Sequence, residues 1–216
     1  MRFLLSLLLL LATPVSADLM MNYNGFYARM KKLQQPEYSD ITLAFALIGE
    51  RSGQPCRFYS LKLVSDRHDI ALDIAGNGEI SLPYDEALKD SNAILTVLQA
   101  DNAEPCQIQF KLRSRMRLNT SLELATVQHY QRQFTLLLDD MAGFSKRWLP
   151  AVEGVIVEFA EDTTTPQMPI TAADVTRCDA RRCYIRLTTP LLPAATNWQF
   201  NQRPQYILPL IGSSVK

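Results

Sequence analysis

Apolar side chains recur at steps of three and four residues between Val127 and Trp148, which is the spacing of an α-helix with one apolar face. Polar and charged residues occupy the remaining positions, and Pro150 ends the pattern. We therefore predict one long amphipathic helix over about residues 126–148, with Gly143 as the position that favours a kink. Its aromatic stripe is expected to pack in the core against a sheet.

On both sides of this helix the pattern changes to short runs of strand-forming residues, several of which alternate between apolar and polar positions. The expected strands are residues 41–48, 57–64, 69–74, 79–82, 93–99, 107–112, 154–159, 183–188 and 205–211. Two shorter helices are expected at 23–34 and 84–90, and Gly76–Gly78 is the clearest hairpin turn. These elements predict an α+β protein that is mostly antiparallel β, of sandwich or meander type.

The first 17 residues differ from the rest, because one basic residue, Arg2, precedes an apolar run that ends in small residues at Ala17. This order is typical of a secretory signal peptide, and the run is shorter than the roughly 20 residues of a membrane span. We predict cleavage after Ala17, with an uncleaved anchor as the alternative. Residues 18–216 are then expected to form a single α+β domain, with β-rich parts at 37–118 and 154–212.

The composition is that of a folded globular protein, with 47% hydrophobic residues and 22 basic against 22 acidic residues. Removal of 17 of the 216 residues would leave 199 and, with Arg2 gone, one acidic residue in excess. A nucleic-acid partner generally requires an excess of Lys and Arg, so we expect none. No later apolar run is long enough to predict a membrane span in the mature chain.

The chain contains four cysteines, and in an exported protein an even number favours disulfides. Three pairings are possible. We favour Cys56–Cys106, because each follows a proline and precedes a strand-like run, and Cys178–Cys183, because this pair would close a short hairpin. A redox or zinc site is the weaker alternative, since the spacing is C-x4-C and no histidine lies nearby.

Catalytic and metal-binding patterns are absent from the sequence. It has two histidines: His68 is expected in a solvated turn between strands, and His129 on the surface or edge of the long helix. No nucleophile-elbow, phosphate-loop, zinc-protease or dinucleotide motif occurs, so we predict no catalytic residue, no metal and no cofactor. A hydrolase acting on envelope polymers remains an alternative, with carboxylates chosen from Asp66, Asp69, Glu123 and Asp140.

The most binding-like group of residues lies near the predicted mature N-terminus. Tyr23, Tyr27, Arg29 and Lys32 combine aromatic and basic side chains, which are frequent at protein contacts and on sugar-binding surfaces. The alternative is a short amphipathic helix that packs its apolar side inward and leaves its basic residues in solvent. Trp198 is a second candidate, although core packing is the favoured interpretation for it.

Several short motifs resemble one known family. They are Tyr23-x-x-Phe26-Tyr27-x-Arg29-x-Lys31-Lys32-Leu33, Leu82–Asp85 before Asn92-Ala93, Pro150 before Glu153–Val155, and Pro204-x-x-Ile207-Leu208-Pro209-x-Ile211. The family is a domain-of-unknown-function family of predicted periplasmic proteins from gamma-proteobacteria. The resemblance extends over nearly all of the mature chain. It implies a periplasmic location and no particular activity.

Three hypotheses about function follow. The first is an exported, periplasmic, non-enzymatic module that binds an envelope protein or a glycan through loops or an exposed sheet edge. The second is the carboxylate-dependent hydrolase described above, and the third is a structural or assembly factor. Whether the protein is an enzyme is left open, with the balance against it.

Overall fold

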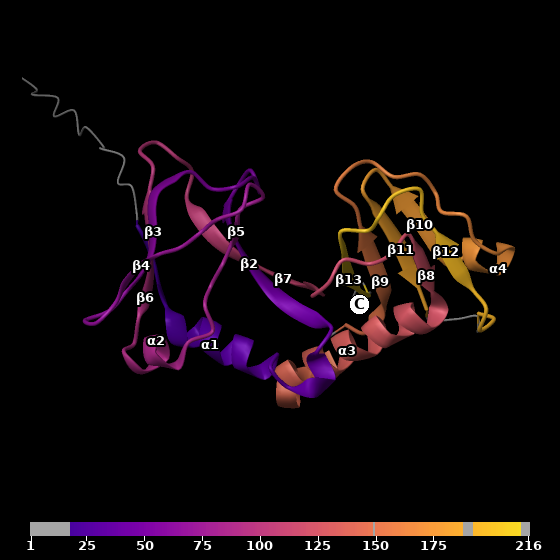
Figure 1. The fold of residues 1–216 in the computed structure, drawn as a ribbon, viewed down its shortest axis with the longest axis horizontal. Coiled ribbons are helices and arrows are strands. Elements are labelled where there is room, and N and C mark those ends of the chain that lie inside the picture. The colour runs from indigo at the N-terminus through magenta and orange to yellow at the C-terminus, as the bar shows by residue number, and fades with distance from the viewer. Residues whose placement is uncertain (1–17, 149, 188–191, 213–216) are drawn as a thin grey trace, which may run out of the picture. The chain divides into compact units, whose positions relative to one another are not determined.

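The computed structural model describes residues 18–148, 150–187 and 192–212, so the predicted signal peptide, residues 1–17, lies outside the described residues (Figure 1). The described chain is α+β, and the strand pairs resolved in register are antiparallel. The predicted fold class is therefore confirmed. No helix in these described ranges is both long and apolar enough to cross a membrane.

The chain divides into two compact units. Of the described residues, the first unit comprises 18–24 and 46–109, and the second comprises 25–45, 110–148, 150–187 and 192–212. The division falls inside three continuous elements, which are α1 (Tyr23–Lys32), β2 (Ile41–Gly49) and β7 (Cys106–Ser114). The expectation of one folding domain stays a prediction, and a test of it is given in the Discussion.

The main sheet of the first unit has the strand order β1-β6-β3-β4. These strands are β1 (Leu19–Asn22), β6 (Ile94–Gln99), β3 (Phe58–Val64) and β4 (Asp69–Ala71). Helix α2 (Glu86–Asp90) begins where the Asp85 side chain accepts a 2.7 Å hydrogen bond from the Ala87 N–H. Cys56 and Cys106, the favoured pair, are joined by a disulfide.

A second, three-stranded sheet has the order β5-β2-β7, and β5 (Glu79–Ile80) follows the predicted Gly76–Gly78 turn. Gly78 has a φ of +84°, and a β-carbon there would lie 2.8 Å from the Leu47 carbonyl oxygen. Both the left-handed backbone and this close approach require glycine at the turn. The turn thereby brings β5 alongside β2.

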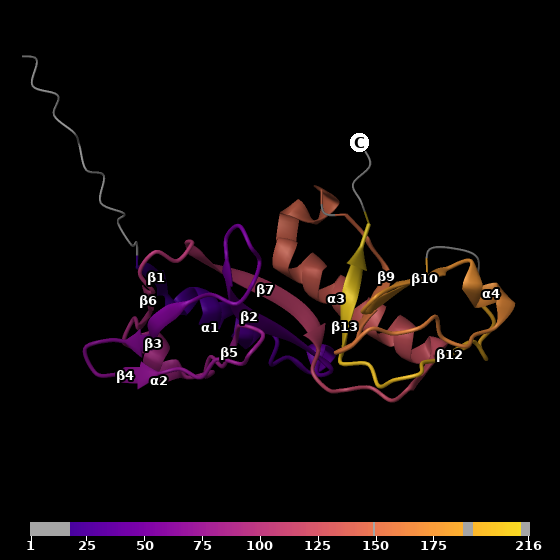
Figure 2. The same cartoon turned by 90° about the horizontal axis from the view of Figure 1, so that it is seen from above.

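The second unit is built on a sheet of order β10-β11-β9-β13, whose strands are labelled in Figure 1 and seen from above in Figure 2. Its strands are β10 (Thr176–Asp179), β11 (Arg182–Arg186), β9 (Val152–Glu158) and β13 (Tyr206–Ile211). A two-stranded sheet of β8 (Ser121–Glu123) and β12 (Asn197–Gln199) and three short helices complete the unit. The short helices are η1 (Pro36–Tyr38), η2 (Gly143–Trp148) and α4 (Ile170–Ala173).

Helix α3 (Leu124–Ala142) packs its apolar stripe against one face of the four-stranded sheet. Val127, Tyr130, Phe134 and Leu137 of the helix share one buried cluster with the β9, β11 and β13 side chains that point toward them. Trp198 is fully buried in the same cluster, and its indole N–H donates a 2.8 Å hydrogen bond to Thr176 Oγ1. The favoured interpretation of Trp198 as a core residue is confirmed.

The long helix ends earlier than the periodicity predicted. Gly143 adopts a φ of +54°, which ends α3, and residues 143–148 form the 3₁₀ helix η2 instead. The apolar stripe is buried as far as Leu137, but Phe144 and Trp148 are 100% and 80% exposed. Core packing of these last two aromatic residues was therefore a wrong expectation.

Candidate functional site

The four-stranded sheet of the second unit has an outer face, which we define as the side chains that point away from α3. Because side chains alternate along a strand, this face can be read from the antiparallel register. Its members are Arg177 and Asp179 of β10, Arg182, Tyr184 and Arg186 of β11, Ile156 and Glu158 of β9, and Tyr206, Leu208 and Leu210 of β13. The outer face is thus rich in arginine and tyrosine, the residue types enriched at recognition surfaces.

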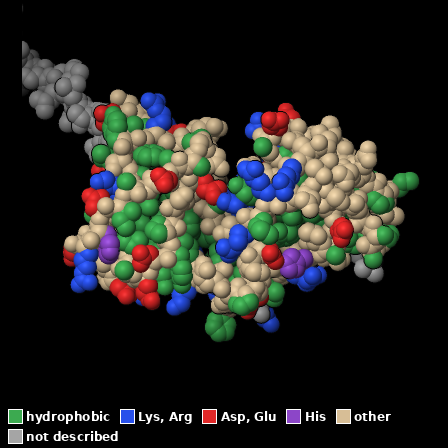
Figure 3. Space-filling view, viewed as in Figure 1, with side chains coloured by type: hydrophobic (Ala, Val, Ile, Leu, Met, Phe, Trp, Pro, Cys, Tyr) green, Lys and Arg blue, Asp and Glu red, His purple; other side chains and the backbone are tan. Residues whose placement is uncertain are grey.

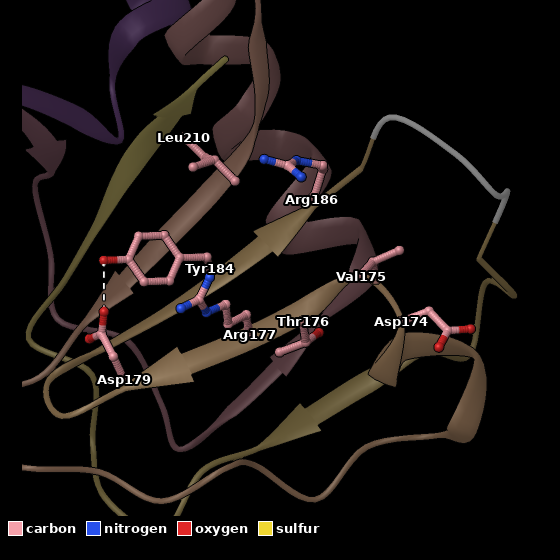
Figure 4. A pocket seen from close by; sticks show the side chains of 8 residues that line it. All are labelled: Asp174, Val175, Thr176, Arg177, Asp179, Tyr184, Arg186 and Leu210. Carbon is pink, nitrogen blue, oxygen red and sulfur yellow. Dashed lines mark hydrogen bonds between the residues drawn. The ribbon is translucent and has the colours of Figure 1, made fainter. Parts of the chain in front are cut away.

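One part of the outer face is hollowed (Figure 4). We call it the arginine hollow. It has a volume of about 550 Å³ and is lined by Asp174, Val175, Thr176, Arg177, Asp179, Tyr184, Arg186 and Leu210. That volume lies within the range of small-molecule sites, about 300–1,000 Å³.

The register of the β10–β11 hairpin brings the two arginines of the hollow together around a tyrosine. Arg177 lies directly across from Tyr184, and Arg186 follows Tyr184 by two residues on the same strand. Residues two apart on a strand are separated by about 7 Å. Figure 4 shows the Arg177 side chain beside Tyr184, whereas the Arg186 guanidinium extends toward Leu210.

The polar partners within the hollow differ between the two arginines. Arg186 Nε forms a 2.9 Å ion pair with Glu153, and the Tyr184 hydroxyl donates a 3.0 Å hydrogen bond to Asp179. Arg177 is exposed, and its guanidinium makes no hydrogen bond or ion pair with any residue that the structure describes. Arg177 therefore supplies an available cation next to a positioned ring.

A disulfide and a buried hydrogen bond hold the β10–β11 hairpin that carries Arg177 and Tyr184. The disulfide Cys178–Cys183 joins the residue after Arg177 to the residue before Tyr184 across the hairpin. Thr176, on the opposite face of β10, accepts the hydrogen bond from the buried Trp198. Six of the eight lining residues therefore lie on strands, and Asp174 and Val175 lie in the turn between α4 and β10.

A charge cluster lies beside the hollow on the same face. Glu158 is only 12% exposed, and its carboxylate accepts hydrogen bonds from Lys111 Nζ and, at 3.2 and 2.8 Å, from two nitrogens of Arg182. Burial alone would raise the pKa of Glu158, but the bonds from the two cations outweigh it and lower that pKa. Glu158 is thus an ionised carboxylate that neutralises part of the basic face.

An apolar groove of about 400 Å³ adjoins this cluster. Its lining is Leu43, Phe110, Lys111, Leu112, Leu138, Met141, Ile156, Arg182, Leu208, Pro209 and Ile211. Phe110 is 47% exposed there, and the Arg29 guanidinium lies 5.1 Å from the centre of its ring. The second unit therefore offers a polar hollow and, separately, an apolar groove.

The four binding residues predicted from the sequence lie in different environments. Tyr23 is fully buried in the first unit, where its hydroxyl donates to the Pro83 carbonyl at 2.6 Å. Tyr27 is 6% exposed in the second unit. Arg29 lies over Phe110, and Lys32 Nζ forms a 2.9 Å ion pair with Asp140. A ligand would therefore meet only Arg29 and Lys32 of these four at the surface.

His129 and Asp40 form the one acid–histidine pair of the described residues. His129 Nε2 lies 2.8 Å from Asp40 Oδ2, and Gln133 donates a 3.1 Å bond to the same oxygen. The hydrogen bond from His129, helped by that from Gln133, lowers the pKa of Asp40. Within the described ranges no hydroxyl or thiol is hydrogen-bonded to His129, so the pair lacks the nucleophile of a hydrolytic site. His68 lies in the β3–β4 turn, as expected, between Ser65 and Ser91.

Two of the four carboxylates of the hydrolase hypothesis, Asp69 and Asp140, are held in ion pairs. Glu123 precedes the first residue of α3 and Asp140 lies near its end, so about 25 Å of helix separates them. Paired glycosidase carboxylates lie about 5–10 Å apart. Asp69 is ion-paired with Lys62 at 3.0 Å, and Asp140 with Lys32. These contacts give the hydrolase hypothesis no support, and no three metal-ligating side chains cluster in the part of the chain that the structure describes.

The fold and this site define a disulfide-bonded α+β protein with a basic, aromatic sheet face. The chain belongs to the family described as protein of unknown function (DUF2987), whose model matches residues 15–159. The match includes α3 and β9 and ends before β10, so all eight residues that line the arginine hollow lie outside the matched residues. Comparisons with curated proteins and with solved structures give no match.

The sequence analysis did not identify Arg177, Tyr184 and Arg186, although a signal for them was present. Residues 183–188 were recognised as alternating, and the favoured Cys178–Cys183 pair places Arg177 opposite Tyr184 once the two strands form a hairpin. What the sequence did not provide was the face of the sheet that α3 covers. That choice decides whether these three side chains are buried or exposed.

Proposed function

We propose that the protein is a non-enzymatic binding protein of the periplasm, and that its arginine hollow takes an anionic segment of an envelope glycan. The signal-peptide pattern of residues 1–17 and the two disulfides support an exported protein. The balanced composition and the shape of the hollow favour a ligand recognised locally, and not through overall charge.

The observation that carries the proposal is the uncompensated Arg177 guanidinium beside the ring of Tyr184. A guanidinium binds carboxylate or phosphate through two parallel hydrogen bonds. An aromatic ring offers a flat apolar surface against which a sugar can stack. Asp174 and Asp179, which also line the hollow, are acceptors for sugar hydroxyl groups. This combination suits a sugar that bears a negative charge better than it suits an apolar molecule.

Co-sedimentation with purified peptidoglycan sacculi, which carry carboxylates, tests this function. We expect the mature protein to sediment with the sacculi and Arg177→Ala to lose at least about tenfold in affinity, because one charge-assisted pair is removed. Arg67→Ala is the matched control, since Arg67 is an exposed arginine of the first unit in the β3–β4 turn. Equal binding by Arg177→Ala and the native protein, or no binding by either, would contradict the proposal.

A second candidate function, binding of a protein segment, is favoured by the apolar groove with its half-exposed Phe110. This corresponds to the assembly-factor hypothesis. Affinity purification from the periplasm tests this second function. It is supported if a partner that co-purifies in a fixed ratio with the native protein is lost with Phe110→Asp and kept with Arg177→Ala. A partner lost only with Arg177→Ala would instead assign it to the hollow.

A further inference from the structure

The residues that line the arginine hollow carry charges of both signs. Two arginines, Arg177 and Arg186, and two aspartates, Asp174 and Asp179, belong to the lining, so its formal charge is zero. Basic and acidic side chains both appear on the visible face of the second unit, at the right of Figure 3. A ligand with only negative charge would meet two carboxylates as well as two guanidinium groups, and like charges repel. The lining is therefore better suited to a ligand that carries charges of both signs.

Contacts within the protein engage one charge of each sign. The Arg186 guanidinium forms a 2.9 Å ion pair with Glu153, whose own charge offsets it. The Asp179 carboxylate accepts the 3.0 Å hydrogen bond from the Tyr184 hydroxyl, which holds the ring in place on the neighbouring strand. These two lining residues therefore have partners in the protein before any ligand arrives, and a ligand gains less from contact with them.

The other two charged residues of the lining, Arg177 and Asp174, are exposed. Neither side chain forms an ion pair or a hydrogen bond with any residue that the structure describes, so they do not pair with each other. Figure 4 shows Arg177 beside Tyr184 and Asp174 beyond Val175, at the other end of the hollow. Because each residue of a chain spans at most about 3.6 Å, the α-carbons of Arg177 and Asp174 lie within about 11 Å of each other. The hollow therefore presents a cation and an anion at two separate points.

We propose that the occupant of the arginine hollow is zwitterionic, with a carboxylate that Arg177 binds and an ammonium group that Asp174 binds. Val175, which lies between these two residues and also lines the hollow, offers apolar surface to the aliphatic carbons that join the two groups. The inference rests on the proposed function and names its ligand class more closely. The ligand is then the peptide part of an envelope glycan, in which a diamino acid supplies an ammonium group close to carboxylates, and not the sugar alone.

The two contacts give selectivity because each one rejects a group of its own sign. A guanidinium binds a carboxylate through two parallel hydrogen bonds, and a carboxylate binds an ammonium group through a charge-assisted one. An ammonium group therefore satisfies Asp174 more fully than a sugar hydroxyl would, since both partners are charged. Each pair is solvent-exposed and weak when alone, so tight binding requires a ligand that makes both contacts at once.

Chemical modification of purified peptidoglycan sacculi tests the ammonium contact. Acetic anhydride converts the ammonium groups of the sacculi into neutral amides and leaves their carboxylates unchanged. In co-sedimentation, we expect the mature protein, residues 18–216, to bind untreated sacculi about fivefold more tightly than acetylated sacculi, because acetylation removes one exposed charge pair. The carboxylate contact with Arg177 remains in both preparations, so binding to acetylated sacculi is weakened and not abolished.

One variant and one control connect this preference with Asp174. Asp174→Asn removes the charge at nearly constant volume, so it should bind untreated sacculi about fivefold more weakly than the native protein does. It should also bind untreated and acetylated sacculi equally. Asp73→Asn is the matched control, because Asp73 is an exposed aspartate of the first unit whose side chain forms no ion pair with the described residues. The control should keep the native affinity and the native preference, and circular dichroism verifies that both variants fold.

The possible results separate this inference from the proposed function. If the native protein binds untreated and acetylated sacculi equally well, the zwitterionic ligand is excluded, whereas an anionic glycan ligand is still supported. A preference for untreated sacculi that Asp174→Asn retains would also overturn the inference, because the ammonium group would then contact a different residue. Loss of binding with Arg177→Ala but not with Asp174→Asn would assign the hollow to an anion alone. Absence of binding to untreated sacculi would contradict both proposals.

Discussion

Replacement of Glu158 by glutamine removes the central charge of the cluster on the outer face and keeps the shape of the side chain. The native carboxylate is 12% exposed and accepts hydrogen bonds from Lys111 and Arg182. A hydrogen bond to a charged group contributes about 1.5–3 kcal/mol, and breaking a buried pair costs about 3–5 kcal/mol.

The side chains of Lys111 and Arg182 are 32% and 48% exposed, so water partly replaces the hydrogen bonds that they lose to Glu158. We therefore expect Glu158→Gln to lower the free energy of unfolding at pH 7 by about 2–3 kcal/mol. In a protein of this length that corresponds to a fall of roughly 5–10 °C in Tm.

The pH dependence gives a second, independent readout. The pKa of Glu158 is lowered in the folded protein, so its ionised form stabilises the native state at pH values above the ordinary glutamate pKa of about 4.3. This stabilisation is lost as the pH falls through the lowered, folded-state pKa. The difference in stability between native protein and Glu158→Gln should therefore shrink in acid.

Denaturant unfolding at neutral and acid pH, followed by circular dichroism, measures both quantities. Glu161→Gln is the control, because Glu161 is exposed and its carboxylate forms no ion pair with the residues described; it should change stability by less than about 0.5 kcal/mol. A Glu158→Gln protein as stable as the control, or a loss of unfolding free energy that is the same at low pH, would refute this role of Glu158.

Three further predictions concern the stability of the two units. Replacing Cys56 and Cys106 by serine removes a link between residues 50 apart in the sequence, and chain entropy predicts that the free energy of unfolding falls by about 4 kcal/mol. Denaturant unfolding with and without a reductant measures this change, and an unchanged midpoint would contradict the prediction. Phe134→Ala should lower the free energy of unfolding by about 3–5 kcal/mol, because this ring is fully buried between α3 and the sheet. A thermal unfolding curve equal to that of the native protein would contradict this and show that the core closes around the cavity. Because α1, β2 and β7 run through both units, we expect one cooperative transition with coincident near- and far-ultraviolet dichroism, whereas two separated transitions would show independent units.

The parts of the fold that follow from local sequence were predictable. The periodicity of α3 and the alternation of the strands identified the α+β class. An element that buries one face has apolar residues at the spacing of that element, three and four in a helix and two in a strand. The favoured cysteine pairs, which are those of the structure, came from repeated local sequence around Cys56 and Cys106 and from the short spacing of Cys178 and Cys183.

The end of α3 shows where periodicity is insufficient. Phe144 and Trp148 continue the spacing of the stripe, but the backbone at Gly143 turns left-handed. A glycine within a helical pattern is compatible with either a kink or an end, and tertiary packing decides between them. The spacing alone therefore placed two exposed side chains in the core.

Side-chain contacts between residues far apart in the sequence were not predicted. Asp40 and His129 meet across 89 residues, and Lys111 and Glu158 across 47. Tyr23 and Tyr27 looked like surface residues because a short helix was expected to bury one side only, whereas both rings are buried in the structure. Such outcomes depend on which elements pack together, and single-sequence patterns do not contain that information.

The order of the two disulfides along the chain has a consequence for the export that we propose for this protein. Of the three ways to pair four cysteines, the structure uses the one that joins neighbours in sequence, Cys56 with Cys106 and Cys178 with Cys183. A chain that crosses a membrane N-terminus first presents its cysteines in that same order. An oxidant that joins each new thiol to the one already exposed would therefore make the native set directly, without a disulfide isomerase to correct it.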